Sequence, residues 1–136
     1  MSVKWDTEYE TGVRLIDLQH KNFTQKLDKL IDAVEKGRGM VEVSKMIAYL
    51  SDYINSHFEL EEKYMRDYNY PEAEFHRSQH LKFKTFLKEI KDEYVHKRLD
   101  SGFIKYCKEQ IWVYFVEHIT VIDTNMARFL KSKGAV

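Results

Sequence analysis

"DYNYPEAEFHRSQH", residues 67–80, contains the only proline of the 136-residue chain, Pro71, followed by two histidines four residues apart, His76 and His80. The stretch separates two long segments in which apolar residues recur at spacings of three and four, the period of an amphipathic helix. Residues four apart share one face of a helix. The stretch therefore predicts a break between two helices, with a pair of imidazoles on one face of the second helix.

Two further breaks divide the rest of the chain in the same way, "EKGRG" at 35–39 and "KRLDSG" at 97–102, and "KSKG" at 131–134 closes it. One proline and five glycines are few, and this scarcity favours long helices over a sheet with many turns. Short connections favour antiparallel neighbours. We predict one all-α domain over residues 1–136, an antiparallel up-down-up-down four-helix bundle. Its helices are expected near 13–36, 40–67, 71–97 and 101–132, after an extended N-terminal arm at 1–12.

The predicted helix ends carry suitable residues. Asp17 or Thr11 is expected to cap the first helix, and Pro71 is tolerated in the first turn of the third. Asp100 or Ser101 is expected to cap the fourth helix, and Gly134 to end it.

Composition excludes several classes of protein. The 22 basic and 22 acidic residues balance, so there is no electrostatic reason to expect nucleic acid or an acidic membrane as a partner. The single cysteine, Cys107, excludes an intrachain disulfide and a cysteine-built zinc site, and we expect it to be a buried apolar filler. The N-terminus is polar, and no apolar run approaches the roughly 18 residues that span a bilayer. We predict a soluble cytoplasmic protein.

Four histidines fall at one level of the predicted bundle. His20, His57, His80 and His118 each lie 17 or 18 residues from the break that joins their helix to its antiparallel neighbour. At 1.5 Å rise per residue this is about 25 Å from each loop, so the four imidazoles should lie at nearly the same height.

Two carboxylates accompany these histidines. Glu61 follows His57 by four residues and shares its face, whereas Asp123 follows His118 by five. Five residues turn an ideal helix by about 500°, which leaves roughly 140° between the two side chains. Either Asp123 reaches around the helix or the helix is locally distorted.

Seven polar side chains are thus expected in one layer of the core: His20, His57, Glu61, His76, His80, His118 and Asp123. Burying them without partners would be costly, and metal ions would remove that cost. Seven ligands exceed one tetrahedral zinc site, and two six-coordinate ions that share both carboxylates fit better. Imidazole with carboxylate suits iron, among other metals.

These residues resemble the motifs of the hemerythrins, most closely those of single-domain bacteriohemerythrins, over essentially the whole chain. Trp5, Gly12, Ile16, Asp17, Gln19 and His20 are similar to the family's W…G…ID-x-QH pattern. "HFELEEKYM", "YPEAEFHRSQH" and "HITVID" resemble its HFxxEExxM, YPxxxxHxxxH and HxxxxD motifs. The ordered set is far more specific than any one motif.

The resemblance implies a non-haem di-iron centre that binds dioxygen reversibly. It implies that His76, His80 and His118 ligate one iron and that His20 and His57 ligate the other. Glu61 and Asp123 would bridge the two irons, with an oxo or hydroxo group as a third bridge. Dioxygen would bind at the open position of the two-histidine iron and be held as hydroperoxide.

The expected ligand pocket is apolar, since dryness prevents further reduction of bound dioxygen. Phe83, Tyr114, Phe115 and Ile119 are its candidate wall, within a helical turn of His80 or His118. Hemerythrins commonly carry Trp-Leu where this chain has Tyr114-Phe115. The bulkier Phe115 is expected to narrow the pocket, and the Tyr114 hydroxyl to add a donor.

The other candidates have structural interpretations. We expect His96 on the surface, Glu62 facing solvent, and Trp5, Tyr64 and Met65 in packing roles. Two alternative functions stay open: a di-iron enzyme (an oxidase, a peroxidase or an enzyme acting on nitric oxide), or an oxygen or redox sensor that needs a separate partner. The chain has only one Glu-x-x-His spacing, Glu93 to His96, unlike the paired spacings of ferritin-type enzymes. A carrier, store or scavenger of dioxygen is therefore favoured, and its protein recipient is unknown.

Overall fold

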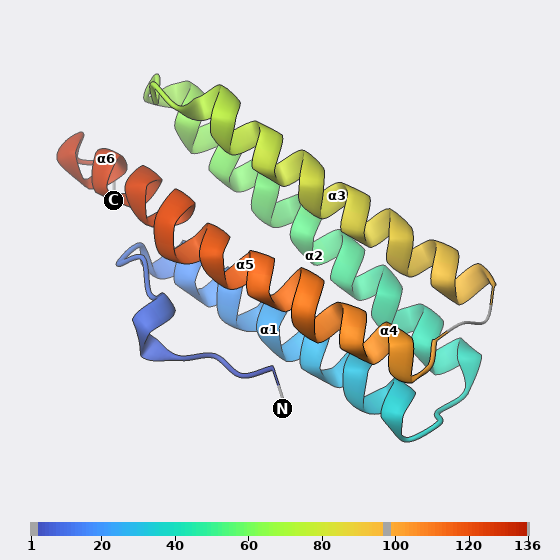
Figure 1. The fold of residues 1–136 in the computed structure, drawn as a ribbon. Helices are drawn as coiled ribbons and strands as arrows, with labels where there is room; N and C mark the ends of the chain where they lie inside the picture. The colour runs from blue at the N-terminus through green and yellow to red at the C-terminus, as the bar shows by residue number, and fades with distance from the viewer. Residues whose placement is uncertain (1–2, 97–98, 136) are drawn as a thin grey trace.

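The computed structural model describes residues 3–96 and 99–135, and this part of the chain is helical and contains no strand. Four long rods lie side by side and alternate in direction (Figure 1). The first three rods are α1 (Arg14–Glu35), α2 (Met40–Asp67) and α3 (Ala73–Val95), and the fourth runs over 101–132. The predicted four-helix bundle is confirmed. Residues 1–2 of the predicted arm and Lys97 at the predicted end of the third helix lie outside the described residues.

The fourth rod is a composite of α-helical and π-helical segments. It contains α4 (Ser101–Tyr106), α5 (Val113–Glu117) and α6 (Thr124–Ser132), joined by π-helical segments at Cys107–Trp112 and His118–Asp123. The backbone stays in the right-handed helical region at each junction, so the rod is continuous. A π-helical turn holds more residues than an α-helical turn, because its hydrogen bonds join residues five apart.

The sequence predicted an extended N-terminal arm, but the described part of the arm is not extended throughout. Thr7–Tyr9 form a short 3-10 turn, and the carboxylate of Asp6 accepts a hydrogen bond of 2.9 Å from the Glu8 amide. Such a side-chain cap favours the turn over an extended strand. The Trp5 ring lies beside His20 of α1, and Tyr9 contacts Trp112 of the fourth rod. The arm therefore covers the seam between the first and fourth rods.

Asp17 does not cap α1 in the expected way. Val13 occupies the N-cap position, and Asp17 reaches backwards from the first turn instead. Its carboxylate accepts from the Thr11 amide at 2.7 Å and from the Gly12 amide at 3.1 Å. Gly12 has φ of +86°, a conformation that strongly favours glycine. This clamp fixes the angle at which the arm enters α1.

The other helix ends follow the sequence more closely. Of the two candidates for the fourth rod, Asp100 is the cap: it accepts from the Gly102 and Phe103 amides at 3.0 and 3.2 Å. Gly134, with φ of +70°, ends α6. Pro71 lies in the turn before α3, which begins two residues later than the first helical position predicted.

A polar layer divides the apolar core into two parts. The larger part includes Leu27, Leu50, Leu87 and Ile111, and the smaller includes Ile16, Met65, Met126 and Leu130. Along each rod the predicted ligand residues fall between members of the two parts. None of the described helices is long and apolar enough to cross a membrane.

Candidate metal centre

All seven predicted ligand residues converge in the polar layer. Their exposed fractions run from 0% for His20, Glu61 and Asp123 to 6% for His57. Each rod contributes: α1 one histidine, α2 and the fourth rod a histidine and a carboxylate each, and α3 two histidines. This geometry agrees with the prediction that the histidines lie at one height, which came from counting residues between each histidine and the nearest break.

The seven side chains form two overlapping groups. His76, His80 and His118 gather with Glu61 and Asp123, while His20 and His57 gather with the same two carboxylates. Within each group, one nitrogen or oxygen atom from every residue lies within 4.8 Å of the others. Both carboxylates therefore stand between a three-histidine position and a two-histidine position.

Asp123 divides its two oxygens between the groups. Its Oδ1 lies 2.9 Å from His76 Nε2 and 3.0 Å from His118 Nε2, and its Oδ2 lies 2.9 Å from His20 Nε2. The π-helical segment His118–Asp123 makes this possible, because it brings residues five apart towards the same face. Of the two possibilities raised by the sequence, local distortion of the helix is the one observed.

Glu61 contacts both groups through one oxygen. Its Oε1 lies 3.0 Å from His80 Nε2 and 3.3 Å from His57 Nε2. The second oxygen, Oε2, is buried and has no hydrogen-bond partner among the described residues.

The donor atoms of the layer fit a pair of cations. Both oxygens of Asp123 and the Nε2 atoms of His76 and His118 are buried without a hydrogen bond among the described residues, although they approach one another within 3.0 Å. The Nε2 atoms of His20 and His57 lie 3.0 Å apart. Lone pairs that converge in this way, in a buried layer, repel one another unless a proton or a metal ion lies between them.

The electrostatics of the layer favour charged carboxylates. Burial raises the pKa values of Glu61 and Asp123, and repulsion from Asp123 also raises that of Glu61, but the surrounding imidazoles outweigh these effects and hold the pKa of each carboxyl well below its usual range. Burial lowers the pKa of His76, yet attraction to the two nearby carboxylates prevails and raises the pKa to about 10. His20 shows the opposite balance, since burial dominates and lowers its pKa. Two anionic groups are thus held among imidazoles in the core.

Two histidines of the layer have hydrogen-bond partners on their outer side. His80 Nδ1 donates to Glu62 Oε2 at 3.1 Å, and His57 Nδ1 donates to the amide oxygen of Gln19 at 2.6 Å. The expectation that Glu62 faces solvent is therefore wrong, since its side chain is only 27% exposed and is turned towards α3. Neither contact was visible in the sequence. The only signal for Glu62 was its place beside Glu61 in the "EE" pair.

Apolar rings enclose the layer. Phe83, Phe115 and Ile119, three of the four predicted wall residues, are buried beside it, with Phe83 5.5 Å from the His118 ring and Phe115 5.5 Å from the His20 ring. Sequence reasoning missed Phe58, which stacks on His80 with ring centroids 3.9 Å apart.

The fourth predicted wall residue, Tyr114, is half-buried and lies nearly parallel to the His118 ring. Its hydroxyl donates to Gln79 on α3. The expected extra donor is therefore engaged in a contact between two helices.

The remaining candidates lie outside the layer. His96 is exposed and donates to the Asp92 carbonyl at 2.8 Å. Cys107 is fully buried in the larger part of the core, and burial raises the pKa of its thiol to about 12. Met65 is buried in the smaller part of the core, and Tyr64 packs against it. These positions agree with the structural interpretations.

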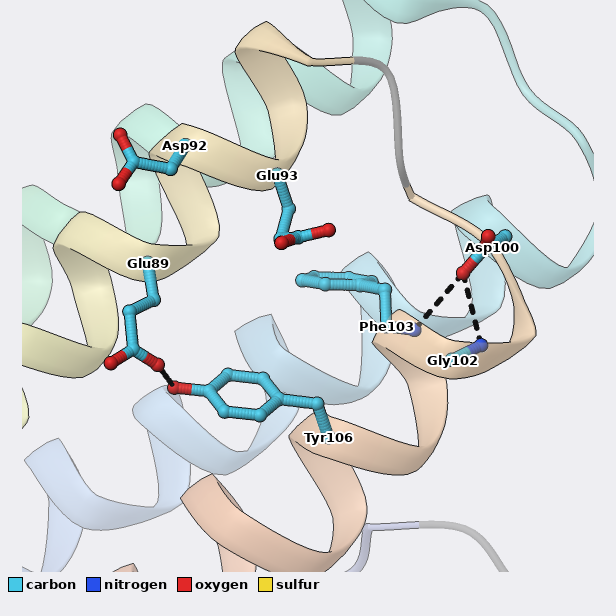
Figure 2. Close-up of a pocket in the computed structure, with 7 residues that line it drawn as sticks. All are labelled: Glu89, Asp92, Glu93, Asp100, Gly102, Phe103 and Tyr106. Carbon is cyan, nitrogen blue, oxygen red and sulfur yellow. Dashed lines mark hydrogen bonds between the residues drawn. The ribbon is translucent and has the colours of Figure 1, made fainter.

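A second group of carboxylates lines a cavity of about 400 Å³ between the C-terminal part of α3 and α4 (Figure 2). Glu89 accepts a hydrogen bond from the Tyr106 hydroxyl, and Asp100 caps α4. Figure 2 shows both contacts, and in this view the Phe103 ring lies between Glu93 and the Tyr106 ring. Glu89 thus joins α3 to α4, and Asp100 stabilises the start of α4.

Comparison with known proteins agrees with the geometry. The family model of the hemerythrin HHE cation binding domain matches residues 11–130. A bacteriohemerythrin of Pseudomonas aeruginosa (strain LESB58) is 34% identical over 79 residues, which are 58% of this chain and 51% of that protein. A bacteriohemerythrin of Aquifex aeolicus is 20% identical over 130 residues, which are 96% of this chain and 98% of that protein. The matched part thus spans about half the length of the Pseudomonas relative and nearly all of the Aquifex one.

Solved structures give the same result. The crystal structure of a leucine-to-phenylalanine mutant matches with a TM-score of 0.80 and 25% identity, over 96% of this chain and 98% of that one. A hemerythrin with a leucine-to-tyrosine mutation also has a TM-score of 0.80, at 24% identity over the same shares, and supports the fold. The buried histidine and carboxylate cluster indicates a metal site. The chain belongs to the hemerythrin family.

Proposed function

We propose that this protein binds dioxygen reversibly at a non-haem di-iron centre, as a carrier, store or scavenger. The observation that carries the proposal is the pair of groups that share Glu61 and Asp123, one with three histidines and one with two. A three-histidine position and a two-histidine position differ by one ligand. That difference leaves room for a small molecule on the two-histidine side.

In this proposal the three-histidine position is held by His76, His80 and His118, and the two-histidine position by His20 and His57. Glu61 and Asp123 would serve both positions, and the placement of Asp123 Oδ1 and Oδ2 on different groups supports this role. When bound, two ferrous ions would supply the two electrons that dioxygen binding requires. Imidazole-rich, carboxylate-poor donor sets are compatible with iron.

The chain's own residues would orient the ligands and exclude water. Glu62 and Gln19 hold the outer nitrogens of His80 and His57, so that the Nε2 atoms face inwards. Phe58, Phe83 and Phe115 enclose the layer with apolar rings. A dry enclosure supports reversible binding, because protons that would complete the reduction of dioxygen are kept away.

The runner-up is a di-iron enzyme, such as an oxidase or peroxidase. Such chemistry needs a proton donor beside the bound oxygen. The Tyr114 hydroxyl was the candidate donor, and its hydrogen bond to Gln79 argues against that role. A sensor that acts with a partner protein has no observation in its favour. The cytoplasmic location inferred from composition stays a prediction.

The test is metal content per chain together with the absorption spectrum. We expect about two irons per chain, and a ferrous protein that gains an oxygenated spectrum in air and loses it under vacuum. Rapid irreversible oxidation with turnover of a reductant would instead identify an enzyme. One zinc ion per chain, with no bound iron, would end the di-iron hypothesis.

A further inference from the structure

The two halves of the candidate centre have different outer hydrogen bonds. On the three-histidine side, the acceptor of His80 Nδ1–H is the carboxylate of Glu62 at 3.1 Å. On the two-histidine side, the acceptor of His57 Nδ1–H is the neutral amide oxygen of Gln19 at 2.6 Å. Among the described residues, the Nδ1 atoms of His20, His76 and His118 have no hydrogen-bond partner. Each half therefore has one outer partner, and the two partners differ in charge.

The difference in charge has a chemical consequence. A carboxylate that accepts from Nδ1–H draws the proton outwards and makes Nε2 a stronger donor to a metal ion. A neutral amide fixes the same tautomer but adds less electron density to the imidazole. A hydrogen bond to an ionised acceptor is roughly twice as strong as one to a neutral acceptor. Both acceptors come from helices that carry a ligand: Glu62 follows Glu61 on α2, and Gln19 precedes His20 on α1. Packing of the bundle therefore fixes both contacts.

We propose that Glu62 and Gln19 are positioning residues that make the two metal positions unequal, so that the three-histidine position fills first and empties last. This inference rests on the proposed two-metal function. Glu62 is partly exposed, so the cost of desolvating its carboxylate is limited. Its hydrogen bond with His80 strengthens metal binding at the three-histidine position. Gln19 orients His57 without adding charge. The weaker position is the one proposed to take dioxygen.

The experiment titrates the metal-free protein with Zn²⁺, followed by calorimetry and by NMR of ¹⁵N-labelled histidine side chains. In the unaltered protein, the first equivalent should shift the signals of His80 and His118, and the second those of His20 and His57. Glu62→Gln should weaken the tighter step by about 10- to 100-fold, the usual effect of losing such a partner. Glu59→Gln is the matched control, because Glu59 is an exposed residue of the same helix.

A charge exchange makes the test sharper. The double variant Glu62→Gln with Gln19→Glu moves the carboxylate from the three-histidine side to the two-histidine side. We expect the gap between the two affinities to narrow by at least about tenfold, or the order of filling to reverse. Unchanged affinities and order in this variant would overturn the inference, provided that circular dichroism shows the native helix content.

The metal-free protein gives an independent readout. With Glu62 in place, the ¹⁵N shifts of His80 should report a proton on Nδ1 directed at Glu62, and Glu62→Ala should move the Nδ1 shift. A residue that only supports packing would not move these shifts. If the unaltered protein binds no second zinc ion, the two-metal function fails. If the unaltered protein binds two zinc ions and Glu62→Gln leaves both affinities unchanged, only the proposed role of Glu62 and Gln19 fails.

Discussion

His118 and Asp123 are five residues apart, yet His118 Nε2 lies 3.0 Å from Asp123 Oδ1. An ideal α-helix would place the two side chains roughly 140° apart. The π-helical segment His118–Asp123 removes this difference, and the Thr124 hydroxyl follows the same wide period when it donates to the Ile119 carbonyl at 3.0 Å. The π-helical turn thus accommodates one additional residue between His118 and Asp123 while keeping both side chains in the layer.

Removal of that additional residue should be tolerated. Deletion of the exposed Thr120 would leave the histidine and the aspartate four residues apart, the spacing that an ordinary α-helix places on one face. We expect the variant to fold and to retain about two metal ions per chain, measured by elemental analysis and thermal melting.

The matched control deletes the exposed Lys84 in the regular helix α3. This change rotates the rest of α3 by about 100° and takes Leu87 and Ile90 out of the core, at a cost of about 2–5 kcal/mol for each side chain. Equal tolerance of the two deletions would contradict the structural role of the π-helical turn.

His76→Ala should release or loosen one metal ion. His76 Nε2 lies 2.9 Å from Asp123 Oδ1 inside the layer, whereas the exposed His96 serves as the control. Loss of one of three histidines should reduce affinity at that position by at least about tenfold, and His96→Ala should leave both metal ions in place. Iron content after dialysis against a chelator is the measurement, and equal losses in the two variants would count against the ligand assignment.

Phe115→Leu should open the enclosure beside His20. The Phe115 ring stands edge-on to His20 at 5.5 Å and packs on Phe23 at 4.4 Å, so a smaller side chain leaves space there. We expect azide or dioxygen to bind faster, by several-fold or more, and stability to fall by about 1–3 kcal/mol. Stopped-flow absorption and thermal melting measure the two effects. Phe129→Leu, in the smaller part of the core against Tyr70, should lower stability alone.

Metal binding near neutral pH should release protons. In the metal-free protein the carboxylates raise the pKa of His76 to about 10, so its imidazole is protonated at pH 7, and a metal ion requires the neutral form. The raised pKa also stabilises the metal-free fold below the unfolded value of 6.5, and this contribution declines as pH rises towards 10.

Calorimetry in two buffers of different ionisation enthalpy should therefore show release of about one proton per chain or more at pH 7. Affinity for the metal should rise with pH over the range from 6.5 to about 10. Binding without proton release would show that His76 is already neutral in the metal-free protein.

The sequence predicted the bundle and the level of its histidines because both depend on chain length between breaks. A helix has a fixed rise, so counting residues from Gly37 or Ser101 is enough to place His20 and His118 in height. The need for a distortion at Asp123 followed from the same geometry, but helical period alone could not say whether the backbone or the side chain adapts.

The outer contacts could not be predicted in this way. Glu62 lies one residue beyond Glu61, so on α2 it points about 100° away, and only the position of α3 decides whether it meets solvent or His80. The stacking of Phe58 on His80 depends on the same packing angle between the two helices. The turn at Thr7–Tyr9 was missed because a single Asp6 cap gives little signal in a polar arm.

The ligands of the layer extend from His20 to Asp123 and belong to all four rods, so bound cations would tie together parts of the chain that are remote in sequence. Unfolding would have to expel them. A metal ion that binds only the native state adds about 2.7 kcal/mol to the free energy of unfolding when its free concentration is a hundred times its dissociation constant. Loss of the metal ions would then lower the free energy of unfolding of the whole bundle as well as empty the layer.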